Sequence, residues 1–186
     1  MKTPLFFKLL LMLALGLRLI YAARKSRKRE AVSYYSMKTY EDKPLVIPEG
    51  IDPNQPVAEQ LKFIYRKAVR GQMDSQTKVL VFLAVELEKT LQKGKLFRFI
   101  WHRNKWVIVF YEALQKMGFT DQSIQYSRAL FELTETDLTR TEAADLDPEA
   151  LFPHGEKDSP GWKAFEASFN LKEFQNSVMW LVKTSI

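Results

Sequence analysis

The sequence predicts an all-α fold: a compact bundle of about six to seven helices preceded by a single N-terminal membrane-targeting helix. Three observations lead to this prediction. One apolar segment with an unbroken core at residues 9–17 lies near the N-terminus, and apolar residues recur at helical spacing from about residue 57 onward. No stretch alternates with period two for long enough to build a sheet. About 130 residues remain for the bundle, enough for one domain with a substantial core.

The first predicted element is a membrane segment, apolar from Leu5 to Ala23 apart from Lys8 and Arg18. Its 19 residues, at a rise of 1.5 Å each, come close to the roughly 30 Å hydrocarbon core of a bilayer. Representative positions of this segment are Leu5, Leu9, Leu13, Leu17 and Ala23. A basic collar follows at once, formed by Arg24, Lys25, Arg27, Lys28 and Arg29. The collar is also suited to bind anionic lipid.

The N-terminal side of the segment carries Lys2, Lys8 and the terminal amine, whereas the C-terminal side carries more positive charge, Arg18 and the basic collar. Because positively charged flanks stay in the cytoplasm, we expect a single-pass anchor with the C-terminal domain cytoplasmic. A hairpin insertion with an external domain is one alternative. Another is a signal peptide cleaved near Ala23, followed by export of the domain. Ile20 and Tyr21 fit a small-residue cleavage site poorly, and the collar would resist translocation.

Charge separates residues 1–30 from the rest of the chain. Residues 1–30 hold eight basic side chains and one acidic one, whereas the other 156 residues hold 20 basic and 21 acidic ones. The overall excess of positive charge therefore belongs to the membrane segment, and nucleic acid ranks below protein as an expected partner. Residues 31–55 contain several Pro and Tyr residues and are expected to form a linker, either free or lying along the domain surface.

The bundle is predicted to span residues 56–186. Its first helix, 57–70, follows Pro56, and its apolar face holds Leu61, Ile64, Tyr65 and Ala68. The second, 75–93, has Asp74 as its expected N-cap and Gly94 after its end. Residues 79–85 are apolar on every side, which predicts a helix buried at the centre of the domain.

Five further helices are expected. A short aromatic helix covers 95–102, a helix from 106 to 117 ends at Gly118, and another runs from 121 to 133 after Thr120 as N-cap. An acidic loop with a turn near 149–151 occupies 134–160, and a final pair covers 161–169 and 171–184. The last helix is expected to bury Phe174, Val178 and Leu181, with Met179 and Trp180 as further candidates.

Four stretches of this bundle, residues 76–88, 93–99, 111–119 and 127–131, resemble an all-α family of bacterial domains that includes the C-terminal part of a DNA-mimic protein. The resemblance covers about residues 57–184. Family members usually carry Asn-Gly-Gly followed by an aromatic residue, Gln and a second aromatic residue. Here Gly94 remains and Arg98 stands where Gln is usual. The resemblance implies a binding module without known chemistry; in the DNA-mimic member, acidic surface imitates phosphate and captures a DNA-binding regulator.

The charge of the bundle is divided along the chain. Residues 62–116 hold twelve basic and four acidic groups, whereas 117–186 hold six basic and twelve acidic ones. The candidate basic binding face consists of Lys62, Arg66, Arg70, Arg98 and Arg103, with Lys67 and Lys105 nearby in sequence. The candidate acidic face consists of Glu132, Glu135, Asp137 and Asp145. The simpler interpretation is that the basic side chains form a solvated surface and pair with the acidic half.

No pattern for catalysis, a metal or a cofactor is present. The seven glycines form no phosphate-binding loop, Cys is absent, and the two histidines, His102 and His154, lie in different segments. Glu112 fits a surface or capping role, and the aromatic residues near it fit a core. The sequence leaves the oligomeric state open. We expect a membrane-tethered, non-catalytic module that recruits or sequesters a protein partner. The alternatives are a nucleic-acid or anionic-lipid binder using the basic half, or an exported cell-envelope domain.

Overall fold

The computed structural model describes residues 35–92, 96–140, 151 and 159–184, without the side chains of residues 92, 98, 101, 102 and 104. The chain divides into two compact units, residues 1–33 and 34–186, and all described residues belong to the second. The predicted membrane segment and basic collar therefore lie outside the described residues. Within the described part, no helix has the length and apolar character needed to cross a membrane.

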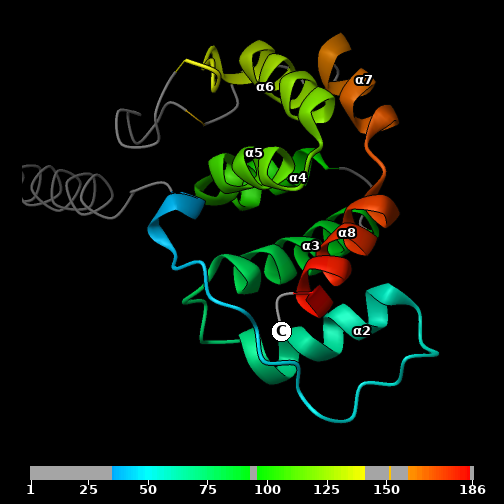
Figure 1. Cartoon of the computed structure of the whole chain (residues 1–186). Coiled ribbons are helices and arrows are strands. Elements are labelled where there is room, and N and C mark those ends of the chain that lie inside the picture. Colours follow the sequence, from blue (N-terminus) through cyan, green and yellow to red (C-terminus); the bar gives the residue numbers. More distant parts are fainter. Residues whose placement is uncertain (1–34, 93–95, 141–150, 152–158, 185–186) are drawn as a thin grey trace, which may run out of the picture. The chain divides into compact units, whose positions relative to one another are not determined.

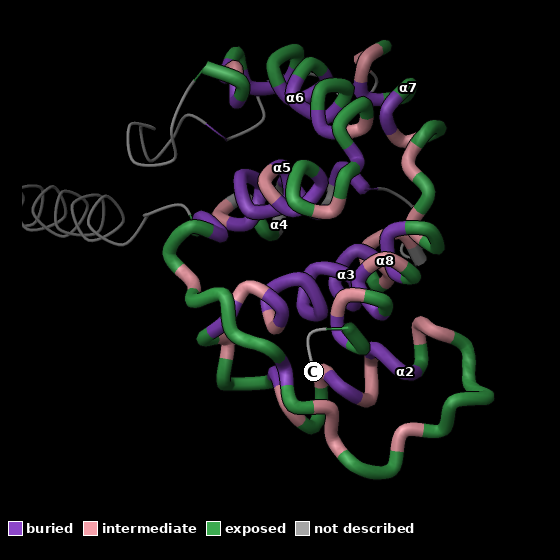
Figure 2. The backbone as a smooth tube through the Cα atoms, viewed as in Figure 1, coloured by how far each residue is buried: buried purple, intermediate pink, exposed green. Residues whose placement is uncertain are grey.

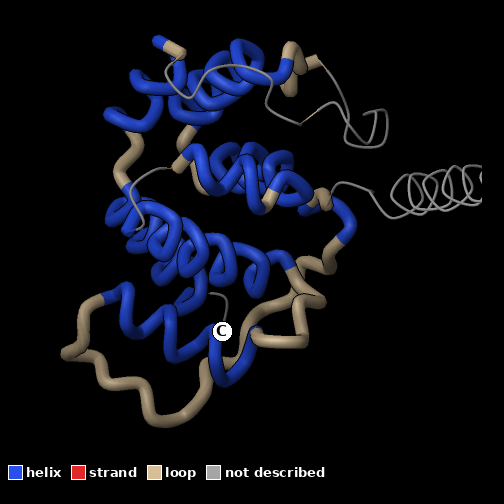
Figure 3. Tube along the Cα trace, turned by 180° about the vertical axis from the view of Figure 1, so that it is seen from behind, coloured by secondary structure: helices blue, strands red, loops and turns tan. Residues whose placement is uncertain are grey.

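The all-α prediction is confirmed for the described residues, which form helices joined by loops (Figure 3). Extended pairing in this part of the chain is limited to one isolated parallel bridge between Glu41 and Ser75. The first helix of the bundle is α2 (Val57–Ile64), which continues as the π-helical turn η2 (Tyr65–Val69). Together they match the predicted helix 57–70, and Gly71 follows in the left-handed conformation that favours glycine.

Helix α3 (Gln76–Gln92) is the buried central helix that the apolar run predicted. Every side chain from Val79 to Val85 is buried, as the continuous purple tube of α3 shows (Figure 2). The expected N-cap differs by one residue: the amide of Lys78 donates to Ser75 Oγ at 3.4 Å. Asp74 pairs instead with Lys78 Nζ at 2.7 Å. Its carboxylate thus contributes charge near the helix start and makes no capping hydrogen bond there.

Helices α4 (Phe97–His102), η3 (Asn104–Trp106) and α5 (Val107–Lys116) follow the predicted order. Helix α6 (Thr120–Thr134) begins at Thr120, one residue earlier than expected, and no side chain caps it. The Ser123 hydroxyl donates to the Thr120 carbonyl at 2.7 Å, so Thr120 supplies a main-chain acceptor and not a cap. After α6, Glu135 adopts a left-handed conformation with φ of 59°.

Helices α7 (Pro160–Ser168) and α8 (Leu171–Thr184) close the domain. Ser159 Oγ caps α7 by accepting from the Trp162 amide at 3.2 Å, and Pro160 takes the first helical position, where its missing N–H costs nothing. On α8, Met179 is buried as expected, but Trp180 is 66% exposed. Trp180 lies one position past the buried face of the helix, so its predicted burial is wrong.

The helices stack as pairs (Figure 1). Helix α6 packs against α7 and α5, while α3 packs against α8, α2 and α4, and α2 also contacts α8. Phe110 of α5 joins these pairs, because its ring centroid lies 5.0 to 6.4 Å from the rings of five other aromatic residues: Phe99, Tyr126, Phe165, Phe169 and Phe174. The aromatic residues between 97 and 111 whose side chains are described are all buried, as a core role predicts.

The compact unit begins about twenty residues before the predicted start of the bundle. Residues 35–45, which we name the entry strap, contain the short helix η1 (Met37–Thr39) and run over α5 and the start of α3. Met37 is 4% and Leu45 is 2% exposed. The Gln76 amide donates to the Glu41 carbonyl at 2.9 Å. Much of the segment expected to be a linker is therefore part of the folded domain.

Candidate binding surfaces

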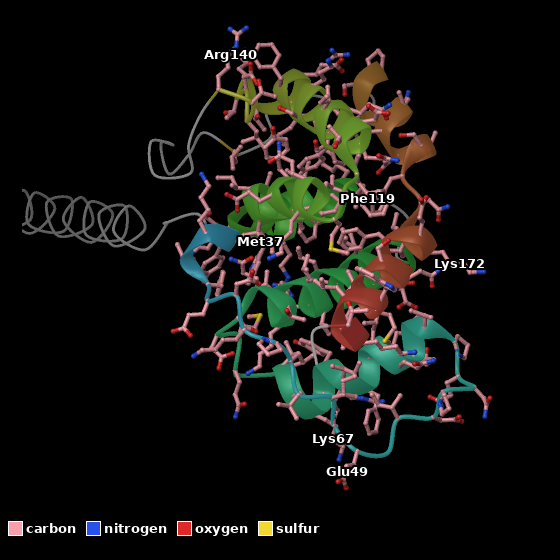
Figure 4. The ribbon with its side chains drawn as sticks, viewed as in Figure 1. Met37, Glu49, Lys67, Phe119, Arg140 and Lys172 are labelled. Carbon is pink, nitrogen blue, oxygen red and sulfur yellow. The ribbon has the colours of Figure 1, made fainter. Side chains whose placement is uncertain are left out.

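Glu112 of α5 holds the beginning of the entry strap. Its carboxylate accepts from the Met37 amide at 2.6 Å and from Ser36 Oγ at 2.8 and 3.0 Å (Figure 4 labels Met37 beside α5). Glu112 thus satisfies the Met37 N–H at the start of η1, while Ser36 Oγ accepts from the Lys38 amide at 3.2 Å. Glu112 thus has the capping role that the sequence suggested, for a helix 75 residues away.

A second set of contacts fixes the point where the chain enters the domain. The Tyr35 amide donates to the Lys105 carbonyl at 2.9 Å, and the Tyr35 ring lies 4.6 Å from the Trp106 ring. Trp106 in turn packs 4.4 Å from Phe82 of the central helix. We name the surface around this point the entry patch: Tyr35, Lys38, Arg103 and Lys105. It combines a partly exposed aromatic ring with three cations.

Two members of the candidate basic face are paired within the domain. Lys62 Nζ lies 2.7 Å from Glu59 and 2.9 Å from Glu88, and these two carboxylates, Glu59 first, raise the pKa of Lys62. Arg103 Nη2 lies 3.3 Å from Glu86. The partners thus come from α2 and α3, whereas the sequence analysis expected them in the acidic C-terminal half. Packing of α2 against α3 brings Lys62 to Glu88, and packing of α4 against α3 brings Arg103, which follows α4, to Glu86.

Of the remaining members of the basic face, Arg66 and Arg70 have described side chains, and Lys67 lies between them in sequence. Arg66, Lys67 and Arg70 lie on or just after η2 with exposed side chains, and within the described part of the chain no acidic group lies within 4 Å of them. Lys67 Nζ is 5.9 Å from the Phe63 ring centroid. The side chain of Arg98 lies outside the described residues. The structure therefore brings Arg66 and Arg70 together, next to Lys62 on the same helical segment, and places Arg103 after α4.

Much of the candidate acidic face is used inside the domain. Glu132 Oε2 accepts from the Gly161 amide at 3.0 Å, at the start of α7. Asp137 accepts from Thr139 Oγ1 at 2.6 Å and from the Thr139 amide at 2.9 Å, and this bonding holds the pKa of Asp137 below its usual value. Glu135 is exposed. Asp145 lies outside the described residues.

An open groove of about 610 Å³ runs along the outer side of α6. Phe131, which is 51% exposed, and Ile124 provide its apolar part. Among the described residues, its lining is Ile124, Ser127, Arg128, Phe131, Glu132, Asp137 and Thr139. We name this surface the α6 groove; Figure 4 labels Arg140, which follows its last lining residue. It contains two of the predicted acidic residues together with an exposed aromatic ring that was not predicted to take part.

The spacing of apolar residues along the sequence only weakly indicates the apolar part of the α6 groove. Ile124 and Phe131 are seven residues apart, which places them on one side of a helix. Buried residues of α6, including Tyr126, Leu130 and Leu133, lie on the other side. A helix with apolar residues on both sides predicts a second contact surface, because one side is enough to attach the helix to its own core.

The described residues include no group of three or more His, Cys, Asp or Glu side chains that could hold a metal ion. The side chain of His102 and the whole of His154 lie outside the described part. The two buried side-chain atoms without a hydrogen-bond partner there, Gln60 Oε1 and Trp162 Nε1, come from separate elements, α2 and α7.

No family model matches this chain, and no match was found among curated proteins or among solved structures. The resemblance to the family that includes a DNA-mimic protein therefore stays a prediction.

Proposed function

We propose that this protein is a membrane-tethered, non-catalytic, all-α binding module that holds a protein partner in the α6 groove. The observation that supports this most directly is Phe131, a large aromatic ring left half exposed beside an open hollow on a helix that is packed on its other side. Aromatic anchors in well-formed hollows dominate the binding energy of protein interfaces.

The packing of α6 against its neighbours makes its outer side suited to binding. The helix is held by α5 on one side and α7 on another, so its outer side is rigid before a partner arrives. A preorganised surface loses little conformational freedom on binding. Arg128, Glu132 and Asp137 surround the apolar part and would orient the partner through complementary charge.

If the domain is tethered to a membrane, a modest affinity of the α6 groove is enough to retain a partner. Residues 5–23 and the basic collar are proposed to anchor the chain in a membrane, with the domain on the cytoplasmic side. Confinement near the bilayer raises the effective concentration of any partner that is also held there. A groove of the size of the α6 groove is then enough to recruit or sequester it.

Site-specific crosslinking tests the proposal. A photoreactive phenylalanine analogue is placed at position 131 of the full-length protein in cells, and at position 180 as a matched control on another exposed aromatic residue. We expect one discrete protein adduct from position 131 and none from position 180. The Ile124→Asp variant should abolish that adduct, because it places a charge in the apolar part of the groove. Equal adducts from both positions, or an adduct that survives Ile124→Asp, would contradict the proposal.

A second function, binding of nucleic acid through the basic half, is favoured by the exposed cluster Arg66, Lys67 and Arg70. If these three cations contact phosphates, log K should fall with log salt at a slope of about −2.7, a loss of about 40-fold between 50 and 200 mM salt. The measurement is fluorescence anisotropy of a DNA duplex with the full-length protein in nonionic detergent. Replacing all three by Gln should make the slope less steep by about 2.7, because the basic collar remains in the full-length protein. A slope near zero in the parent protein would exclude this function.

A further inference from the structure

We propose that the partner held in the α6 groove is a second copy of this chain, packed antiparallel on the first about a two-fold axis beside Phe131. This inference rests on the proposed function, because it names the occupant of the same groove. It follows from the spacing of exposed side chains on α6, from their charges, and from the symmetry that two identical surfaces impose on their contact.

The outer side of α6 carries a row of exposed side chains at intervals of three or four residues, which we name the α6 row. Its members are Ile124, Arg128, Phe131 and Glu135. This spacing places them on one face of a helix. The Glu135 amide donates to the Phe131 carbonyl at 2.8 Å, so Glu135 still belongs to the last turn. The α6 row therefore extends about 16 Å along the helix axis.

The two charged members of the α6 row are not used inside the domain. Within the described part of the chain, Arg128 and Glu135 form no ion pair and no side-chain hydrogen bond. The acids that line the groove are bonded already: Glu132 accepts from the Gly161 amide, and Asp137 accepts two hydrogen bonds within its own loop. The α6 row therefore offers a partner one cation and one anion, seven residues apart.

Two copies of the α6 row complement each other when they run antiparallel. The midpoint of positions 128 and 135 falls between residues 131 and 132, and we place the two-fold axis there. Arg128 of each copy then lies opposite Glu135 of the other, and the two Phe131 rings meet beside the axis. Such aromatic pairs contribute beyond the area that they bury. A parallel arrangement would instead bring the two arginines together and the two glutamates together, which is unfavourable.

The surroundings of the axis also suit a second copy. Ile124 lines the α6 groove, so an apolar side chain is present to receive an aromatic ring. Glu132 lies beside the axis, but its bond to the Gly161 amide at 3.0 Å draws the carboxylate toward the start of α7. A second copy also carries the same proposed membrane segment, so confinement near a membrane raises its effective concentration wherever the chain is anchored.

Charge reversal in two separately tagged copies tests this contact. Both full-length copies are expressed in the same cells, and one carries the photoreactive phenylalanine analogue at position 131. A second copy in the groove gives an adduct with both tags. An exposed ion pair strengthens an association about two- to threefold, and a like-charge pair weakens it by a similar factor. Because symmetry changes two contacts at once, Arg128→Glu in both copies, or Glu135→Arg in both copies, should weaken the association about 30-fold.

Mixing the two variants gives the sharpest comparison. When one copy carries Arg128→Glu and the other carries Glu135→Arg, both contacts again join opposite charges. The adduct with both tags should then return to near the level of the parent protein, and its return also shows that each variant is folded. As the control, Lys172→Glu makes the same change of charge at an exposed position of α8 and should leave the adduct unchanged.

The outcomes distinguish this inference from the proposed function. A discrete adduct of position 131 with a different protein, and none with the second copy, overturns the second copy and leaves the groove as a binding site. Absence of any adduct from position 131 overturns both proposals. An adduct with both tags that survives either charge reversal, or that does not return when the two variants are mixed, overturns the antiparallel contact.

Discussion

Replacing Glu112 by Ala should release the entry strap and destabilise the domain by about 3 kcal/mol. The carboxylate accepts hydrogen bonds from two donors, the Met37 amide and the Ser36 hydroxyl, at 2.6 to 3.0 Å. A hydrogen bond to a charged group contributes about 1.5 to 3 kcal/mol, so two such bonds give about 3 to 6 kcal/mol. We expect the lower end, because the donors of a released strap regain hydrogen bonds to water.

The assay is urea unfolding of the full-length protein in mild nonionic detergent, combined with hydrogen exchange of the amides from Met37 to Tyr40. Glu112→Gln serves as the matched variant, because it keeps an acceptor and loses only the charge; it should cost about 1 kcal/mol. Glu173→Ala, on the exposed side of α8, should change stability by less than about 0.5 kcal/mol. Parent-like stability and unchanged exchange at Met37 in Glu112→Ala would refute the reasoning.

Two further predictions concern the aromatic core. Phe110→Ala should destabilise the domain by about 3 to 5 kcal/mol, measured by the same urea unfolding, because the ring contacts five other aromatic rings and is fully buried; a loss below 1 kcal/mol would contradict a central position. Burial raises the pKa of Tyr126 well above its usual value of 10.0. Above pH 10 the unfolded chain therefore releases this proton first, and stability should fall by about 1.4 kcal/mol per pH unit because of Tyr126. Tyr126→Phe should remove that part of the slope, and an unchanged slope would argue against burial.

The helices were largely predictable because their information is local. Residues 79–85 are apolar on every side, and the structure buries all of them. Helix ends were less certain, since they depend on single hydrogen bonds: Ser75 supplies the cap of α3 beside the equally suitable Asp74. Trp180 was a further candidate for the core on the last helix, whereas its position along α8 leaves it outside.

The entry strap could not be predicted, because its partners are distant in sequence. Nothing local to Ser36 and Met37 indicates that Glu112 will cap them, and the prolines after residue 43 suggested an extended linker. The same is true of Glu166, which accepts from the Phe97 amide at 3.2 Å, and of Glu132 with Gly161. Three carboxylates thus serve helix starts elsewhere in the fold.

These long-range caps also change how the candidate surfaces are interpreted. Counting charges along the sequence placed Glu132 on an acidic binding face, but its carboxylate is bonded to the main chain of α7. The same count placed Lys62 and Arg103 on a basic face, where carboxylates of α2 and α3 meet them. Phe131 was missed for a different reason: a charge count does not detect an exposed aromatic ring. The groove follows from helix packing, which determines which side of α6 remains open.

The measurement that tests the account most directly is the topology of the full-length protein. The C-terminus is fused to a reporter active only in the cytoplasm and, separately, to one active only after export, and the size of each product is determined. The account predicts a full-length product in the membrane fraction with cytoplasmic reporter activity. Export activity, with a product shortened to a new N-terminus near Arg24, would contradict the tether and require a partner in the cell envelope.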